Sequence, residues 1–245
     1  TDIDDTLTKD GLLCREAFDA LWNLHEVGFT VIPVTGRPAG WCDCILRQWP
    51  VDAIVGENGA FAMYRNGRHL DMMLHPEIRP EGNKAHVFDE LSARVLEEIS
   101  GAAIAKDQPY RLYDVAFDFS EEGRLGLGEA RKIRAIARNF GAEAKISSIH
   151  VNVWFGDYNK LDMVKLLLQN IYKSDITRNR ELLLFCGDSP NDEPMFAFFP
   201  FSVGVRNVEP FLGDMQYHPA YITSELYGRG FREVSEIIMK KRKKQ

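Results

Sequence analysis

The sequence predicts an α/β fold: a Rossmann-like parallel sheet core with helices on both faces, plus an inserted α+β cap domain. Short apolar runs of strand type alternate with helical patterns near both ends of the chain, which favours parallel strands joined by right-handed crossovers. In the middle of the chain this alternation stops. We therefore expect a catalytic core built from residues 1–76 and 157–245 and a cap domain built from residues 77–156. A chain of 245 residues is long enough for two modest domains.

The first part of the chain shows helix and strand patterns in turn. Apolar side chains recur at helical spacing before Gly28, which is expected to stop the first helix. Pro38 opens a second helix with Trp41 on its apolar stripe, and Asn66-Gly67 favours a hairpin turn. The expected elements are, in order, a helix, a strand, a helix, a strand and two hairpin strands, at residues 15–27, 29–34, 38 onward, 51–55, 60–64 and 69–73.

The middle of the chain has a different texture. Pro76, Pro80 and Gly82 mark a crossing out of the core, and Gly156 marks the return. Between these points we expect, in order, a helix, a strand, a helix and two strands, near residues 88–99, 111–119, 128–139, 144–147 and 150–155. After them we expect a helix, a strand, a helix, two short strands and a last helix, at residues 160–172, 182–186, 190–198, 201–205, 220–223 and from about 232.

Composition and charge restrict the class of protein. The chain is 45% hydrophobic, its formal net charge is −6, and a basic run near its end contributes positive charge. A body this acidic is a poor general binder of nucleic acid, and the basic tail is expected to be a solvated helix end. No apolar run approaches the roughly 18 residues of a membrane span, and no signal peptide is recognisable. No strand-like run precedes Asp2, so we expect the parent protein to begin before Thr1.

The cysteines form neither a disulfide framework nor a zinc-binding pattern. They stand at positions 14, 42, 44 and 186, and the two that are closest in sequence point to different faces of a predicted helix. Unpaired cysteines fit a reducing compartment. We therefore expect a cytoplasmic protein, whose oligomeric state the sequence does not indicate.

Two pairs of aspartates carry the functional prediction. Asp2 and Asp4 lie two residues apart, and Asp188 and Asp192 lie four apart after a strand-like run. Ligands of a parallel sheet bind beyond the carboxyl ends of its strands, so these groups are expected to face one crevice. There Asp2 can attack phosphorus and form an acyl phosphate, while Asp4 serves as general acid and base. Either pair alone could be a helix cap or a surface turn, but both together favour a catalytic site.

The same aspartates suit Mg²⁺, which takes oxygen ligands in an octahedron and commonly keeps several waters. The predicted ligands are the carboxylates of Asp2 and Asp188 and the backbone carbonyl of Asp4, with Asp192 as a direct or an indirect ligand. Without a cation, several carboxylates and a phosphate in one pocket would repel each other strongly. Mg²⁺ is therefore the predicted cofactor.

Four other residues are predicted to bind the phosphate. Thr35 offers a hydroxyl, and Gly36 a backbone N–H, at a helix start. Lys160 supplies a fixed positive charge for the nucleophile and the phosphoryl oxygens, and Asn191 could add an amide donor. Taken singly, Lys160 could be a solvated surface group and Thr35 a simple N-cap.

Together these segments resemble the haloacid-dehalogenase-like superfamily of phosphatases. The segments read TDIDDTL at residues 1–7, VTGR at 34–37 and CGDSPND at 186–192, and the match covers nearly the whole chain. The long insert resembles subfamily IIB, whose C2-type cap lies between the second and third motifs, as in Cof-type sugar phosphatases and sucrose-phosphate phosphatases. The resemblance implies a nucleophile, a general acid and base, two phosphate-binding residues and two residues that complete the metal site, namely Asp2, Asp4, Thr35, Lys160, Asp188 and Asp192.

The predicted function is Mg²⁺-dependent hydrolysis of a small phosphorylated metabolite, a sugar phosphate first of all, through an aspartyl-phosphate. Two alternatives stay open: a phosphosugar mutase similar to phosphomannomutases, and a catalytically idle relative that binds or regulates. The cap would close over the pocket and contact the leaving group. Candidates for this contact are polar residues on the predicted cap strands, although alternation turns half of such residues towards solvent: Arg111, Asp114, His150 and Asn152. The sequence does not identify the substrate.

Overall fold

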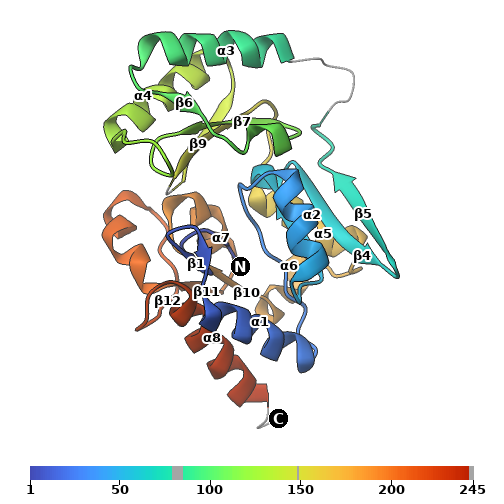
Figure 1. Cartoon of the computed structure of the whole chain (residues 1–245). Helices are drawn as coiled ribbons and strands as arrows, with labels where there is room; N and C mark the ends of the chain where they lie inside the picture. Colours follow the sequence, from blue (N-terminus) through green and yellow to red (C-terminus); the bar gives the residue numbers. More distant parts are fainter. Residues whose placement is uncertain (79–84, 148, 243–245) are drawn as a thin grey trace.

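The protein, described by a computed structural model over residues 1–78, 85–147 and 149–242, consists of a core and a cap (Figure 1). The cap comprises the elements from α3 to β9, which lie above the core sheet in Figure 1. The crossing predicted at Pro80 and Gly82 lies outside the described residues. The domain limits at residues 77 and 156 stay a prediction.

A parallel sheet joins the start of the chain to segments much further along the sequence. Asp2 N donates to Cys186 O at 2.8 Å, and Val34 N donates to Thr1 O at 2.8 Å, so the first residues lie between two later segments. Val34 also forms a parallel bridge with Val55. Cys186 belongs to β10 (Leu184–Gly187), and the parallel strands continue from it through β11 (Phe201–Gly204) to β12 (Tyr221–Ile222).

Beyond Val34 the sheet continues as an antiparallel meander, so the predicted hairpin is present. The strands are β3 (Ala53–Gly56), β4 (Phe61–Asn66) and β5 (His69–Leu74). The strand predicted at residues 29–34 is wrong in extent, because only the single bridge at Val34 forms there. Pro33 has no N–H to donate, and Val31 N donates to the Asp52 carboxylate at 2.8 Å instead.

Helices cover both faces of this sheet, as predicted. Alternate residues of a strand point to opposite faces: Ile54 packs with α1, α2 and α8, whereas Ala53 and Val55 pack with α5 and α7. The core helices are α1 (Arg15–Glu26), α2 (Ala39–Gln48), α5 (Lys160–Asn170), α6 (Ile176–Asn179), α7 (Glu193–Phe198) and α8 (Tyr227–Arg242). Among the described residues, no helix combines the length and the apolar character that a bilayer crossing requires.

The cap is a four-stranded antiparallel sheet with two helices on its far side (Figure 1). Its strands follow the order β6-β7-β9-β8, and its elements are α3 (Ala85–Glu98), β6 (Ala103–Ile104), η2 (Gln108–Tyr110), β7 (Asp114–Asp118), α4 (Leu127–Asn139), β8 (Glu143–Ile146) and β9 (His150–Trp154). Val115 and Phe117 pack under the helices in a separate apolar cluster. The alternate residues, including Asp114, His150 and Asn152, are buried as well, because the core covers that face.

Several boundaries differ from the prediction. Short elements absent from it are β1 (Thr8–Lys9), β2 (Leu12–Leu13), β6, α6, η1 (Glu57–Gly59), η3 (Arg180–Leu182), η4 (Pro190–Asp192) and η5 (Arg206–Asp214). The last helix begins at Tyr227, before two glycines that mask its start in the sequence. A Cβ on Gly228 would lie 2.4 Å from Cys14 Cβ, so close packing accounts for that glycine. Trp41 is 41% exposed instead of lying on a buried stripe.

Gly59 controls how η1 meets the start of α5. Its φ is +107°, and a Cβ there would lie 2.2 Å from the carbonyl oxygen of Asn159. Asn159 caps α5, because its side chain accepts from Asp162 N at 3.1 Å. The backbone contact at Gly59 therefore fixes the position of the residue that follows the cap, Lys160.

We predict that Gly59→Ala lowers the free energy of unfolding by more than about 2 kcal/mol, because the energy cost of the positive φ and that of the clash with Asn159 add together. The matched control is Gly67→Ala, which has φ +60° but no atom within 4 Å of the added Cβ. It should cost about 1 kcal/mol from backbone strain alone. Urea unfolding of both variants measures the difference, and equal losses would contradict the role given to the Asn159 contact.

Candidate active site

The strand ends gather the predicted residues at one edge of the sheet. Asp2 follows Thr1 in the sheet, Thr35 follows Val34, and Asp188 follows β10. Because these segments are parallel neighbours, their next residues emerge on the same side. This edge faces the cap.

Three carboxylates and one ammonium form the centre of the site. Lys160 Nζ donates to Asp2 Oδ1 at 2.7 Å and to Asp192 Oδ1 at 3.1 Å. Asp188 completes the group, since Asp2, Asp188 and Asp192 each offer an oxygen within 4.8 Å of the others. All four side chains are buried. The structure thus brings together residues that are up to 190 positions apart in the sequence.

The two later aspartates have different partners. Both oxygens of Asp192 are engaged, because Oδ1 accepts from Lys160 and Oδ2 accepts from Asp188 N at 3.1 Å. Among the described residues, Asp188 Oδ1 accepts a side-chain hydrogen bond from Thr6 Oγ1 alone, at 3.0 Å. Asp188 therefore has more capacity for a cation, whereas Asp192 is placed to orient Asp188 and Lys160.

Burial and crowding of like charges shift the pKa values at this centre. Burial raises the pKa of Asp2 to about 7, although Lys160 opposes the shift. Burial, followed by the charges of Asp2 and Asp192, raises the pKa of Asp188 well above its usual range. Burial opposes the charge of Lys160, but Asp192 and Asp2 hold its pKa above the ordinary value. Oxygen-only donors with excess negative charge are a set that suits a hard divalent cation.

Asp4 lies apart from this carboxylate group. Its oxygens accept from Arg37, with Nε–Oδ1 3.0 Å, Nε–Oδ2 3.1 Å and Nη2–Oδ1 2.9 Å. The Asp4 carboxylate is therefore absent from the possible metal-binding group, for which the sequence analysis proposed only its backbone carbonyl. Asp4 nevertheless lines the same cleft as Asp2.

The predicted phosphate-binding residues are placed unequally. Gly36 and Asn191 line the cleft, and Lys160, beside Asp2, lines an adjoining hollow that shares Asn191 with it. Thr35 is fully buried, and its hydroxyl accepts from Arg37 N at 3.0 Å, which leaves its own hydrogen to donate. Asn191 Oδ1 accepts from Ser189 Oγ at 3.0 Å, so its amide nitrogen stays available as a donor.

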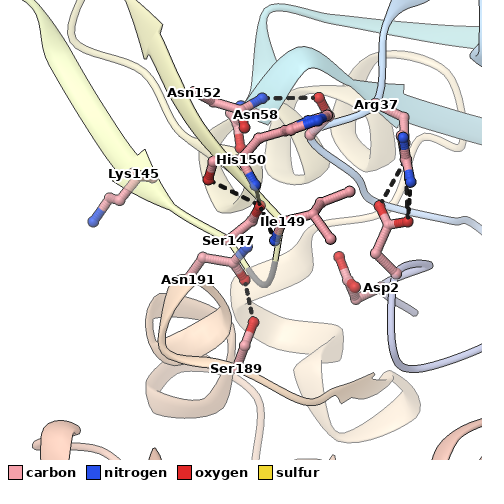
Figure 2. Close-up of a pocket in the computed structure, with 12 residues that line it drawn as sticks. Asp2, Arg37, Asn58, Lys145, Ser147, Ile149, His150, Asn152, Ser189 and Asn191 are labelled. Carbon is pink, nitrogen blue, oxygen red and sulfur yellow. Dashed lines mark hydrogen bonds and ion pairs between the residues drawn. The ribbon is translucent and has the colours of Figure 1, made fainter. Parts of the chain in front are cut away.

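A cleft of about 430 Å³, open to solvent, lies between the core carboxylates and the cap strands (Figure 2). The core lines one wall and the cap the other. The cleft residues absent from the prediction are Arg37, Asn58, Lys145, Ser147, Ile149 and Ser189. Arg37 and Ser189 carried a sequence signal, because both lie inside the motifs VTGR and CGDSPND. Lys145, Ser147 and Ile149 line the cleft because of how the cap lies over the core.

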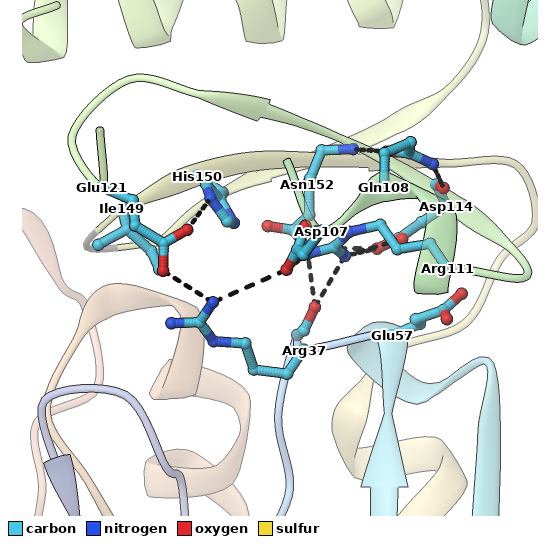
Figure 3. A network of polar contacts seen from close by, with 12 residues as sticks. Arg37, Glu57, Asp107, Gln108, Arg111, Asp114, Glu121, Ile149, His150 and Asn152 are labelled. Atoms are coloured by element: carbon cyan, nitrogen blue, oxygen red, sulfur yellow. Dashed lines mark hydrogen bonds and ion pairs between the residues drawn. The ribbon is translucent and has the colours of Figure 1, made fainter. Parts of the chain in front are cut away.

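The four cap candidates divide into two roles. His150 and Asn152 line the cleft. Arg111 and Asp114 are buried behind it, where Arg111 Nη1 donates to Asp114 Oδ1 at 2.9 Å and to Gly36 O at 3.0 Å (Figure 3). These two residues fix the cap against the core. Alternation along the cap strands does not by itself show which polar residues contact a ligand. The face of the cap sheet that carries these four residues is covered by the core and not by solvent.

A second polar contact fastens the cap to the core. The Glu57 carboxylate, on η1, accepts from Leu112 N at 2.9 Å and Tyr113 N at 2.6 Å, both in the cap. It also accepts from Ala39 N, at the start of α2, at 2.9 Å. Glu57 thus joins the entry to β7 with the helix that follows the Thr35 turn.

Known proteins are similar to this chain in sequence. A family model for haloacid dehalogenase-like hydrolases matches residues 1–81. A phosphoglycolate phosphatase of Methanothermobacter thermautotrophicus is 26% identical over 97% of this chain and 96% of its own length. A phosphoglycolate phosphatase of Methanobrevibacter smithii is 25% identical, with 96% and 95% covered.

Solved structures share the fold over nearly the whole chain. A Thermoplasma acidophilum protein superposes with a TM-score of 0.74 at 19% identity, covering 96% of this chain and 94% of its own. The sucrose-phosphatase of Synechocystis gives a TM-score of 0.64 at 17% identity, covering 95% and 93%. A sugar phosphatase of subclass IIB gives 0.66 at 14% identity, covering 97% and 96%. The predicted resemblance to the haloacid-dehalogenase-like superfamily is confirmed: its family model matches residues 1–81, and the solved structures share the fold over nearly the whole chain.

We predict that Lys160→Met destabilises the protein more at pH 8 than at pH 5.5. At pH 8 Asp2 is ionised, because pH lies above its pKa of about 7, and removal of the Lys160 ammonium leaves a poorly compensated buried charge that costs about 3–5 kcal/mol. At pH 5.5 Asp2 binds a proton and the loss shrinks. The measurement is urea unfolding at both pH values in metal-free buffer.

The matched control is Lys165→Met on the same helix, whose surface partner Asp162 lies 3.5 Å away. Its loss should stay below about 1 kcal/mol at both pH values. A Lys160→Met loss that is the same at pH 5.5 and pH 8 would show that the Asp2 charge does not depend on Lys160.

Proposed function

We propose that the protein hydrolyses a small phosphate monoester in a Mg²⁺-dependent reaction, through an acyl phosphate on Asp2. The observation that carries this proposal is the ion pair between the Lys160 ammonium and the Asp2 carboxylate. It holds Asp2 beside Asp188, in a cleft lined mainly by polar residues. A carboxylate fixed in this way can approach phosphorus in line, and the nearby positive charge offsets its repulsion from the phosphoryl oxygens.

Each step has a residue suited to it. Asp2 attacks the phosphorus, and Asp4, on the same wall of the cleft, donates a proton to the departing alcohol. Asp4 then accepts a proton from the water that cleaves the acyl phosphate. Lys160, the Gly36 backbone and the Asn191 amide bind the phosphoryl oxygens, with the Thr35 hydroxyl behind them.

Mg²⁺ would be held by the carboxylates of Asp2 and Asp188 and by the Asp4 carbonyl, and Asp192 would orient them. The bound ion supplies charge neutralisation between the carboxylates and the phosphate and aligns the phosphoryl group. The fit rests on the donor set, which contains only oxygens, and on Asp188, whose carboxylate keeps unused acceptor capacity.

The substrate class follows from the cleft and from the relatives. The cap wall is lined by the polar side chains of Ser147, His150 and Asn152, and a polar wall of this kind suits the hydroxyls of a sugar phosphate. Phosphoglycolate is the second candidate, because two relatives that align along nearly the whole chain carry the name phosphoglycolate phosphatase. Lys145 supports it, since this cleft-lining cation has no ion-pair partner among the residues that the structure describes.

Two further parts of the proposal concern the cap and the cell. We propose that the cap, with limits near residues 77 and 156, excludes water when it closes on substrate.

We also propose that the protein acts in a reducing cytoplasm, which the free cysteines at positions 14, 42, 44 and 186 support. A phosphosugar mutase differs in its product, which would be an isomeric phosphosugar, and an idle relative would form no product.

We predict that the protein releases inorganic phosphate from a panel of sugar phosphates and phosphoglycolate in the presence of Mg²⁺. Asp2→Asn should reduce kcat by at least about 10³-fold, because an amide is a poor nucleophile of almost the same shape. The control is Asp10→Asn, an exposed aspartate in the turn between β1 and β2, which should keep full activity. Undiminished turnover by Asp2→Asn would remove Asp2 from its role.

We predict that Mg²⁺ raises the unfolding temperature more at pH 8 than at pH 6. A ligand that binds only the folded state stabilises it according to its affinity, and protons compete with the metal for the carboxylates. Since the pKa of Asp2 is about 7, Asp2 is mostly protonated at pH 6 and mostly ionised at pH 8. Asp188→Asn should abolish the shift. A shift of equal size at both pH values, or one that survives in Asp188→Asn, would contradict the metal site.

A further inference from the structure

Arg37 has no place in the chemistry described above, yet it is built into the site. Its guanidinium side chain is 3% exposed and binds Asp4 through Nε and Nη2. The Trp41 ring lies 4.5 Å from the guanidinium carbon, and Arg37 N donates to Thr35 Oγ1 at 3.0 Å. A planar guanidinium offers its donors in a fixed fork, so the direction of this fork sets the direction of the Asp4 carboxylate.

The remaining end of the fork reaches the cap (Figure 3). Nη1 donates to Glu121 Oε1 at 3.0 Å and lies 3.7 Å from Asp107 Oδ2. His150 Nε2 lies 2.9 Å from the other oxygen of Glu121. The contact with the His150 ring, and then the charge of Arg37, lower the pKa of Glu121 to about 2. One side chain of the core is therefore shared between a carboxylate of the core and a carboxylate of the cap.

The turn that carries Glu121 is itself fixed. The Asp118 carboxylate, at the end of β7, accepts from four consecutive backbone N–H groups at 2.9–3.1 Å. These groups belong to residues 120–123. Glu121 therefore has a defined position on the cap and moves with it as part of a rigid turn.

We propose that Arg37 is a positioning residue that orients Asp4 for proton transfer, and that the cap controls this orientation through Glu121. The inference rests on the proposed role of Asp4 as proton donor. Asp4 Oδ1 takes two of the three contacts from Arg37 and Oδ2 takes one, so Oδ2 keeps more capacity for a leaving group. With the cap in place, Glu121 anchors the guanidinium from the opposite side. Proton donation is thereby tied to the closed cap.

The test compares leaving groups. An alkyl phosphate needs a proton on its departing oxygen, whereas p-nitrophenyl phosphate releases a stable anion and does not. The value of kcat/KM reports the steps up to loss of the leaving group, so later hydrolysis of the acyl phosphate does not enter. We expect Arg37→Met to lower kcat/KM on the best alkyl phosphate at least tenfold more than on p-nitrophenyl phosphate. We expect Glu121→Gln to change the same ratio in the same direction by about threefold or more, because its neutral amide anchors the guanidinium less firmly.

Two controls isolate the chain from Glu121 to Asp4. Glu122→Gln alters the neighbouring residue on the same turn, which pairs with Lys106 at the surface, and should leave the ratio unchanged. The double variant Arg37→Met/Glu121→Gln should match Arg37→Met alone, since both act through one guanidinium.

The outcomes separate this inference from the proposed function. A wild-type enzyme that releases phosphate from neither substrate overturns the proposed function and the inference with it. An active wild type in which folded Arg37→Met loses the same factor on both substrates overturns the inference alone, because Arg37 would then serve only the fold. If Glu121→Gln leaves the ratio of kcat/KM between the two substrates unchanged, control of Asp4 by the cap is overturned. This variant alone tests the inference if Arg37→Met does not fold.

Discussion

The Lys160 ammonium lies between two buried carboxylates, 2.7 Å from Asp2 Oδ1 and 3.1 Å from Asp192 Oδ1. Asp2 comes from the start of the chain, Asp192 from the helical turn after β10, and Lys160 from the first turn of α5. Without this cation, negative charges from separate segments would face each other in a medium where water cannot screen them. The sheet brings the segments together, but the ion pairs allow their charged groups to stay together.

A second set of buried charges governs the cap. Arg37 and Arg111 each bind carboxylates and lie where the cap meets the core. Arg111 and Asn152 both donate to the Gly36 carbonyl at 3.0 Å, so the cap also holds the loop that precedes Arg37. The loop at Thr35 and Gly36, the Asp4 carboxylate and the cap are consequently parts of one polar network, so a movement of the cap would change the contacts of each.

The sequence predicted the core of this account because the rules involved are local. Parallel strands expose their carboxyl ends at one edge, so Asp2, Thr35 and Asp188 could be placed at that edge from strand patterns alone. Gly28 and Gly67 marked a helix end and a turn correctly, since both adopt positive φ. The same rules failed at residues 29–34, where Pro33 interrupts the pairing.

The remaining features depend on contacts between distant segments. No periodicity links Arg37 to Glu121, because their contact exists only through the way the cap lies on the core. The sequence did not reveal the early start of α8 for a similar reason. Glycine is a poor helix former, but Gly228 is required here because it packs closely against the start of α1. The two proposed roles, metal ligand for Asp188 and orienting residue for Asp192, also look alike in sequence, and it is their hydrogen bonds that distinguish the two residues.

The most direct test of the central claim is to find where the phosphoryl group resides during turnover. The enzyme is mixed with Mg²⁺ and a ³²P-labelled phosphate monoester, quenched in acid within the first turnovers, digested at low pH and mapped by mass spectrometry. We expect label on the peptide that contains Asp2, and we expect this label to be absent in Asp2→Asn. Turnover without label on any peptide, or label on a residue other than Asp2, would contradict it.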